Sequence, residues 1–219
     1  LYKLLNEAKK NHADMIVFPE YYLPIHWIEE LYAFSRTNSI SIVCGMRYIT
    51  NDQQAYNYMM VLQPFNPNKF KYTIPLFREK NHYAPAEVTA LAQKRFECKD
   101  PLHPSIHLVN WNGIAFSDLM CFELTNIEYR YVLRNKIDLL IVPELNKDTA
   151  YFSNIVESAS RDLHCFVVQA NRVTIIELVK LYLINVRLIL KVNACLCTFM
   201  RIRMDIHWMC PLLLLLDNS

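Results

Sequence analysis

The chain has 219 residues, of which 53% are hydrophobic and 20% are charged, and its net charge is +2. These values are ordinary for a folded α/β protein that forms one large domain or a domain with an appendage. The Lys and Arg residues are scattered, so no basic stretch predicts a nucleic-acid groove. The seven Cys residues follow no repeating spacing, which favours free thiols over a disulfide framework. Free thiols are typical of a reducing compartment, so we expect a cytoplasmic location.

The first part of the chain predicts helices alternating with strands. Leu1, Leu4, Leu5 and Ala8 recur at helical spacing, and the apolar run at 15–18 predicts a buried strand. We expect Pro19 to stop this strand and to present Glu20 at its C-terminal end, where open α/β sheets carry their chemistry. A helix at 27–36 and a strand at 39–44 are expected next. Two further strands follow at 56–62 and 70–74, with a turn at 64–68 between them.

The middle of the chain predicts a loop and a hairpin. Residues 78–87 combine charged and aromatic side chains, which is typical of a loop that faces water. Asn112-Gly113 supplies the positive φ angles of a two-residue turn between strands at 106–109 and 114–120. A helix, a strand halted by Pro143, a second helix and a last strand are expected to follow: 128–134, 138–142, 149–163 and 165–170. This alternation predicts a layered α/β sandwich with antiparallel elements.

The pattern changes after Thr174. One helix from Ile175 to about Val192 fits the Leu/Ile-rich sequence, but it would not continue the alternation. No uncharged stretch approaches the roughly 20 residues that a bilayer requires, so we predict no membrane span. We expect a domain at 1–173 and a poorly packed, protease-sensitive tail at 174–219.

Cys121 lies where a predicted strand gives way to a helix, in the sequence FSDLMCFE at 116–123. A thiol at a helix start is poised to act as a nucleophile, and the amide of Phe122 can face a developing oxyanion. These eight residues by themselves favour a Cys that only fills the core, because free Cys is among the most buried residue types.

Polar residues elsewhere supply partners for the thiol. Glu20, Lys80 and Cys121 stand at strand ends or in the loop between them. A cysteine hydrolase needs a base for the thiol proton, a cation or N–H donor for the oxyanion, and a nucleophile. These three residue types supply those roles. Tyr83 is close enough to Lys80 in sequence to line a pocket, while Glu144, at a strand end, is either a substrate contact or a solvated carboxylate.

Three motifs carry a family resemblance. Residues 18–20 (FPE), 78–80 (REK) and 120–123 (MCFE) resemble, in this order, the Glu, Lys and Cys motifs of the nitrilase superfamily of carbon–nitrogen hydrolases. The resemblance covers roughly residues 1 to 172, and Pro85-Ala86-Glu87 matches the motif of the family's second glutamate. A finer likeness, prompted by 80–85 and 151–158, is to the nitrilase-like domain joined to certain bacterial reverse transcriptases implicated in phage defence.

The resemblance implies a four-layer αββα sandwich and attack of a Cys on an amide or nitrile carbon. In that scheme Glu20 accepts the proton of Cys121, and Lys80 with the amide of Phe122 stabilises the oxyanion. Glu87 positions the substrate or assists proton transfer. The scheme needs no metal or organic cofactor, and its partner is a small amide or nitrile.

The chain departs from the family at both ends. It starts in the first helix without the family's first strand, and nothing after Arg172 resembles the family's closing strands. We therefore expect a sandwich that is incomplete at both ends, from a chain that begins inside a longer protein, with a fused domain or a homo-oligomer as further options. Nucleic acid would be a partner only through such a fused domain. A tail set of Cys195, Cys197, His207 and Cys210 lacks the spacing of structural zinc sites, so no metal is expected.

Two other functions remain open. A non-catalytic scaffold or regulatory module would keep the fold without the reaction. An acyltransferase would use the same Cys, but it needs an amine acceptor site for which the sequence gives no signal.

Overall fold

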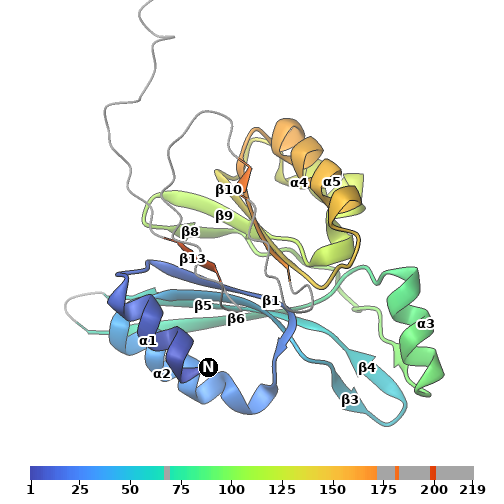
Figure 1. The fold of residues 1–219 in the computed structure, drawn as a ribbon, viewed down its shortest axis with the longest axis horizontal. Helices are drawn as coiled ribbons and strands as arrows, with labels where there is room; N and C mark the ends of the chain where they lie inside the picture. The colour runs from blue at the N-terminus through green and yellow to red at the C-terminus, as the bar shows by residue number, and fades with distance from the viewer. Residues whose placement is uncertain (67–69, 172–180, 183–197, 201–219) are drawn as a thin grey trace, which may run out of the picture.

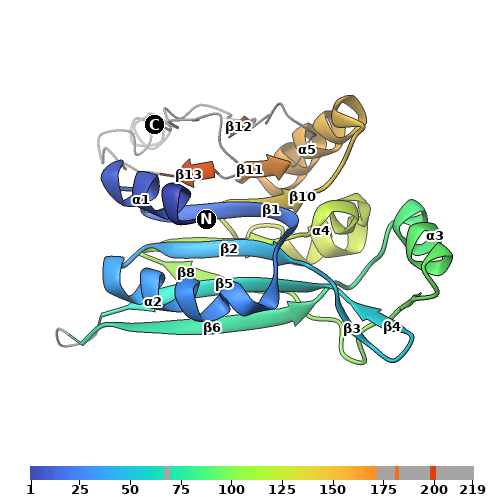
Figure 2. The ribbon, with the colours of Figure 1, turned by 60° about the horizontal axis from the view of Figure 1, so that its bottom comes forward.

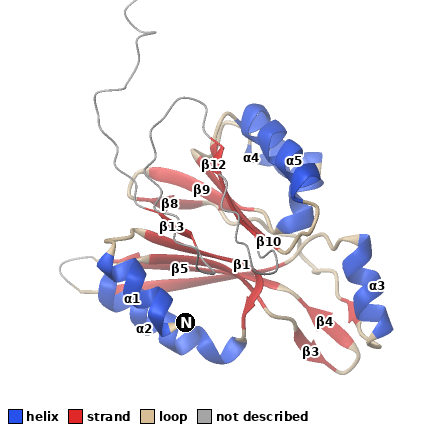
Figure 3. Cartoon of the chain, in the orientation of Figure 1, coloured by secondary structure: helices blue, strands red, loops and turns tan. Residues whose placement is uncertain are grey.

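The computed structural model describes residues 1–66, 70–171, 181–182 and 198–200. Two five-stranded sheets pack face to face, and helices cover their outer faces (Figure 1). Helices α1 and α2 lie over one sheet, whereas α4 and α5 lie over the other (Figure 2). Figure 3 shows the strands inside and the helices outside. The predicted α/β sandwich of four layers is confirmed.

The first sheet has the strand order β13-β1-β2-β5-β6, with only β1 and β2 parallel. Its elements and helices are α1 Tyr2–Lys10, β1 Met15–Leu23, η1 Ile25–Trp27, α2 Ile28–Asn38, β2 Ser41–Met46, β5 Tyr58–Phe65, β6 Tyr72–Glu79 and β13 Thr198–Met200. A small third sheet, with helix α3 beside it, contains β3 Ile49–Asn51, β4 Gln54–Tyr56 and β7 Glu97–Cys98, and α3 is Pro85–Gln93.

The second sheet has the order β12-β11-β10-β9-β8, and β10 is parallel to both of its neighbours. Its elements and helices are β8 Val109–Trp111, β9 Ile114–Asp118, η3 Cys121–Thr125, α4 Ile127–Leu133, β10 Leu139–Glu144, α5 Thr149–Leu163, β11 Phe166–Asn171 and β12 Leu181–Tyr182. Each sheet is therefore built on parallel strands with antiparallel additions.

Three apolar clusters fill the three spaces between the four layers. Successive side chains of a strand point to opposite faces, and β1 follows this rule. Met15 and Val17 pack between the sheets, whereas Ile16 and Phe18 pack under α1 and α2. A third cluster lies between the second sheet and α4 and α5. The inner strands of both sheets are consequently buried on both faces, which holds their ends at fixed positions, whereas the edge strand β6 is partly exposed.

The expectation that Pro19 and Pro143 stop their strands is wrong. β1 continues to Leu23, and Pro19 lies in the irregular stretch that follows the last regular pair of β1 with β2. Pro143 lies within β10 on the side of β9, two residues beyond Ile141, whose pair with Asp118 is the last between the two strands. A proline lacks an N–H, but neither position needs one, so both strands continue.

The expectation of a loop over 78–87 is wrong at both of its ends. Arg78 and Glu79 are the last residues of β6, which pairs with β5 over its whole length. Pro85 opens α3, because proline is favoured in the first turn of a helix. The true connection is therefore only a few residues long, and it places Lys80 directly after a strand. The strand expected at 70–74 overlaps β6 only at 72–74, and the one at 56–62 is divided between β4 and β5.

Other expectations are confirmed or fall outside the described residues. The turn at Asn112-Gly113 has both φ angles positive and helix α5 has the predicted bounds, but β8 shares only residue 109 with the strand expected at 106–109 and extends to residue 111. A continuous helix from Ile175 to about Val192 is wrong at Leu181–Tyr182, which form β12 and pair with β11. The remainder of that stretch and the four residues weighed as a zinc set lie outside the described residues. In the part of the chain that the structure describes, no helix is long and apolar enough to cross a membrane.

Candidate active site

The structure brings Glu20, Lys80 and Glu87 together although they come from three separate elements. Lys80 Nζ lies 2.7 Å from Oε1 of Glu20 and 2.6 Å from Oε2 of Glu87. Asn57 adds a third contact, because its side-chain amide donates a 3.2 Å hydrogen bond to the same Oε1 of Glu20. Lys80 is 1% exposed, so its ammonium group is held almost entirely by protein carboxylates.

Burial and charge act in opposite directions on this cluster. Burial disfavours the charged form of Lys80, but Glu20 and Glu87 outweigh it and raise the pKa of the ammonium group. Burial also raises the pKa of Glu20, which Lys80 partly offsets. Lys80 is therefore a permanent cation at neutral pH, whereas Glu20 is a carboxylate with an increased affinity for a proton.

Cys121 lies beside this cluster at the start of the short 3-10 helix η3. Its φ of +49° is uncommon for a residue with a side chain, which is typical of strained positions at functional sites. The thiol is within hydrogen-bond reach of the Glu20 carboxylate and of the Leu145 backbone N–H. Burial and then the charge of Glu20 raise the pKa of Cys121 well above its ordinary value, although Lys80 opposes this. The resting group is thus a thiol, not a thiolate.

Glu87 is held in place by contacts from three directions in addition to Lys80. The Ala84 backbone N–H donates a 3.2 Å hydrogen bond to its Oε2, at the start of α3. The hydroxyl of Tyr48 donates a short hydrogen bond to its Oε1, and the Asn57 amide lies 3.5 Å from that oxygen. Sequence reasoning gave Tyr48 and Asn57 no role, because their motifs carry no feature beyond ordinary strand composition.

The remaining predicted residues, Tyr83, Phe122 and Glu144, surround the cluster. The Tyr83 ring lies 5.5 Å from Lys80 Nζ, and its hydroxyl accepts a 3.1 Å hydrogen bond from the Asn57 backbone N–H. The Phe122 ring stacks on the exposed ring of His82, with centroids 5.3 Å apart. Glu144 is wholly buried at the end of β10, so the alternative of a solvated loop carboxylate is wrong.

A second buried network supports the turn that carries Cys121. The Arg78 guanidinium donates hydrogen bonds of 2.9 and 2.7 Å to the two carboxylate oxygens of Glu123, and one of 2.7 Å to Asp118. Glu123 also accepts from the backbone N–H groups of Met120, at 2.7 Å, and Asn81, at 2.6 Å. Sequence reasoning missed this network, although Arg78 and Glu123 each stand two residues from a site residue in the motifs.

Burial would by itself disfavour every charge in this network. The pKa of the buried Asp118 carboxyl is nevertheless lowered, because Arg78 and the His107 side chain, 2.7 Å away, outweigh the cost of burial. Arg78 is likewise held charged by Glu123 and Asp118 against the effect of its burial. The network is therefore an internally paired support and leaves no cation free for a ligand.

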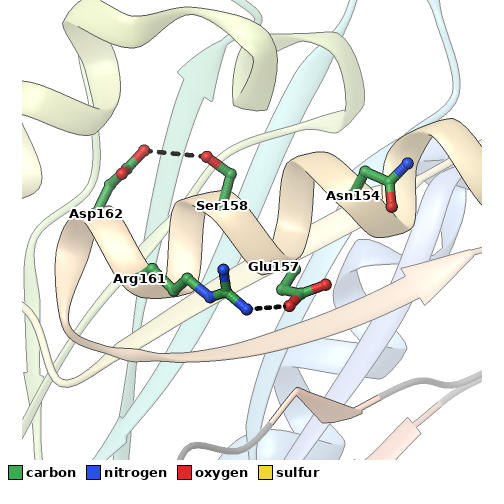
Figure 4. Close-up of a pocket in the computed structure, with 5 residues that line it drawn as sticks. All are labelled: Asn154, Glu157, Ser158, Arg161 and Asp162. Carbon is green, nitrogen blue, oxygen red and sulfur yellow. Dashed lines mark hydrogen bonds and ion pairs between the residues drawn. The ribbon is translucent and has the colours of Figure 1, made fainter.

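A shallow hollow on the outer face of α5 contains none of the candidate active-site residues. It is lined by Asn154, Glu157, Ser158, Arg161 and Asp162, which project from successive turns of the helix (Figure 4). Its charged groups pair with one another or with neighbours, and none of the site residues lines it. Among the described residues, no group of three or more His, Cys, Asp or Glu side chains is arranged to hold a metal ion.

Comparison with known proteins shows the family of the chain. The family model described as carbon-nitrogen hydrolase matches residues 1–189. The chain belongs to the carbon-nitrogen hydrolase family. The match covers every residue of the cluster and extends beyond Arg172, where the motif resemblance ended. No curated protein matches the chain.

Solved structures similar to this carbon-nitrogen hydrolase share its fold at low identity. The NitN amidase from Nesterenkonia sp. AN1 has a TM-score of 0.57 and 16% identity, over 78% of this chain and 71% of that chain. A mutant of that amidase, with the acetamide moiety of fluoroacetamide added covalently at the active site cysteine, has a TM-score of 0.56 and 15% identity over 78% and 68%. XC1258 from Xanthomonas campestris, a CN-hydrolase superfamily protein with an arsenic adduct in its active site, has a TM-score of 0.55 and 15% identity over 79% and 69%.

Proposed function

We propose that this protein hydrolyses a non-peptide carbon–nitrogen bond of a small amide or nitrile through a thioester on Cys121. The observation that carries the proposal is the convergence of three buried groups, the Cys121 thiol, the Glu20 carboxylate and the Lys80 ammonium. Their types match the nucleophile, the base and the oxyanion-stabilising cation that acyl transfer to a Cys requires.

The first half of the proposed reaction with an amide forms the thioester. Glu20 takes the thiol proton as the sulfur of Cys121 attacks the amide carbon, and a carbon–sulfur bond forms while the carbonyl becomes an oxyanion. Lys80 and the backbone N–H of Phe122 stabilise that oxyanion, which is the main electrostatic contribution. Glu20 then gives its proton to the nitrogen, the carbon–nitrogen bond breaks, and ammonia or an amine leaves.

The second half releases the acid and restores the enzyme. Glu20 takes a proton from a water molecule that attacks the thioester carbon, and the carbon–sulfur bond breaks as the tetrahedral intermediate collapses. The proton held by Glu20 returns to the sulfur of Cys121. The raised pKa of Glu20 suits this cycle, because it increases the affinity of the carboxylate for the proton that Cys121 gives up. Glu87 holds Lys80 in place throughout.

The decisive experiment combines ammonia release with mass spectrometry. Small aliphatic amides are offered to the protein, and we expect ammonia release together with an acyl adduct on Cys121. Cys121→Ala should abolish both while leaving the fold unchanged, and Cys98→Ala is the matched control that should retain both. Lys80→Ala should reduce turnover about a hundredfold or more. A protein that releases no ammonia and forms no adduct would instead be a non-catalytic scaffold of the same fold.

A further inference from the structure

Glu144 is a buried carboxyl group with few partners among the described residues, where the Gln169 amide is the neighbouring group that favours its charged form. It is 0% exposed, and neither of its carboxyl oxygens makes a hydrogen bond of ordinary geometry within the described residues. Buried polar groups are nearly always hydrogen-bonded, because an unpaired group loses its hydrogen bonds to water without gaining any within the protein. Burial raises the pKa of Glu144 to about 8, with the nearby Gln169 amide lowering it somewhat and Glu20 raising it further.

The position of Glu144 connects this carboxyl to the reacting atoms. It is the last residue of β10, and the next residue, Leu145, directs its backbone N–H at the sulfur of Cys121. The charge of Glu144 acts on both Cys121 and Glu20. An unpaired carboxyl therefore lies beside the point where the acyl group would form.

The charges around the nucleophile are unbalanced in favour of anions. Two carboxyl groups, those of Glu20 and Glu87, are bonded to one cation, Lys80, and Glu144 adds a further negative charge when it ionises. Arg78, the other buried cation in the part of the chain that the structure describes, is bonded to acids of its own network. A substrate carboxylate would thus be repelled, whereas an ammonium or guanidinium group would supply the partner that Glu144 lacks.

We propose, on the basis of the hydrolase function above, that Glu144 determines specificity by binding a cationic group of the substrate. The substrates are then amides that carry a protonated amine or a guanidinium near the scissile carbonyl. On binding, the Glu144 carboxyl ionises and pairs with the cation, and the pair is shielded from water. Glu144 contacts the substrate and takes no part in bond breaking.

The test compares cationic amides with neutral amides of the same shape. Glycinamide, β-alaninamide and 4-aminobutanamide are each paired with the amide in which a methyl group replaces the ammonium group. We expect kcat/KM to favour the cationic member by at least about tenfold in one pair. Glu144→Gln should reduce that ratio about tenfold or more, whereas Glu128→Gln, on the exposed face of α4, should leave it unchanged.

A second measurement does not depend on turnover or on the variant. The rate of Cys121 modification is measured with 2-aminoethyl and 2-sulfonatoethyl methanethiosulfonate, and the cationic reagent should react at least about tenfold faster than the anionic one. Equal kcat/KM values for the members of every pair, or a ratio that Glu144→Gln leaves unchanged, would overturn the role of Glu144 while leaving the hydrolase function intact. Failure to hydrolyse any amide, with no adduct on Cys121, would overturn both.

Discussion

Arg78 binds Glu123 through two hydrogen bonds of 2.9 and 2.7 Å, and this pair joins the end of β6 to the turn that carries Cys121. The two side chains are 1% and 0% exposed. Because Lys80 follows Arg78 by two residues and Cys121 precedes Glu123 by two, the pair fixes the separation between the cation and the thiol. The pair thus connects the end of β6 to η3, and both charged groups are shielded from water.

Arg78→Met should therefore destabilise the fold strongly. The change leaves Glu123 and Asp118 buried without their cation, which costs about 3 to 5 kcal/mol in the free energy of unfolding. Urea denaturation measures the loss. Arg161→Met is the matched control, because the pair of Arg161 with Glu157 is exposed on α5 and should contribute less than about 1 kcal/mol. Equal losses for the two variants would contradict this assignment.

Gly45→Ala should impair turnover through the position of Glu20. A Cβ atom at residue 45 would lie 2.7 Å from the Glu20 Cα and 3.2 Å from the Met120 sulfur, so the backbone of Glu20 must shift. A displacement near 1 Å at a reacting group reduces turnover about a hundredfold. Ammonia release measures the effect.

Gly113→Ala is the control for that substitution. Gly113 has a φ of +84°, and no heavy atom lies within 4 Å of an added Cβ. The change should cost about 1 kcal/mol of stability through backbone strain alone and leave turnover unaltered. Equal activities for the two glycine variants would mean that the close contact behind Glu20 has no catalytic consequence.

The four Cys residues of the described chain should react in an order set by exposure and by Glu20. We expect 2-chloroacetamide to alkylate Cys121 ahead of Cys44, Cys98 and Cys165, because the Cys121 thiol is within hydrogen-bond reach of the Glu20 carboxylate, which can take its proton. Burial raises the pKa of Cys44, and it raises that of Cys165 to about 12. A maleimide carried on a polyethylene glycol should instead modify Cys98 first, since Cys98 is half-buried and lines a hollow beside α3.

Glu20→Gln separates these two reactivities. It should slow the chloroacetamide reaction of Cys121, because glutamine cannot accept the thiol proton. The maleimide reaction of Cys98 should be unchanged, because its rate does not depend on proton transfer to Glu20. Peptide mass spectrometry measures both rates. A protein in which chloroacetamide modifies other thiols and spares Cys121 would count against nucleophilic catalysis.

Stability should decrease as the pH rises towards 8, and Glu144 should be one cause. Its pKa in the folded protein is about 8, compared with an ordinary value of 4.5, so between these values the folded protein holds a proton that the unfolded chain has lost. The contribution is complete below pH 4.5 and is lost as the pH rises through about 8, with an upper bound of about 5 kcal/mol. Glu20, whose charge acts on Glu144, also has a raised pKa and adds to the same trend.

Glu144→Gln isolates this contribution, because the amide cannot ionise. Urea midpoints between pH 5 and pH 8.5 should change less in Glu144→Gln than in the original protein. Glu128→Gln should keep the original slope, since Glu128 is exposed on α4. Parallel pH profiles for the original protein and Glu144→Gln would show that Glu144 ionises without cost.

The sequence by itself determined the order of the elements and the chemical types at the site. Apolar periodicity located α5 with its correct bounds, and Asn112-Gly113 located the hairpin, because both signals depend only on neighbouring residues. The motifs at Glu20, Lys80 and Cys121 indicated the family, because each motif is a short run of neighbouring residues and the three follow in the family's order. Local patterns failed at Pro19 and Pro143, where the presence or absence of a neighbouring strand decides whether a missing N–H matters.

Only the tertiary structure decided which groups meet and which remain unpaired. Glu20 and Lys80 are 60 residues apart in the chain, and they touch because β1 and β6 end at the same side of one sheet. Whether a carboxyl group is paired with a cation, as Glu123 is with Arg78, or has no cation beside it among the described residues, as Glu144 has none, depends on side chains that long-range packing brings close. Electrostatic energies depend on distance and on burial, and neither quantity exists until the chain has folded.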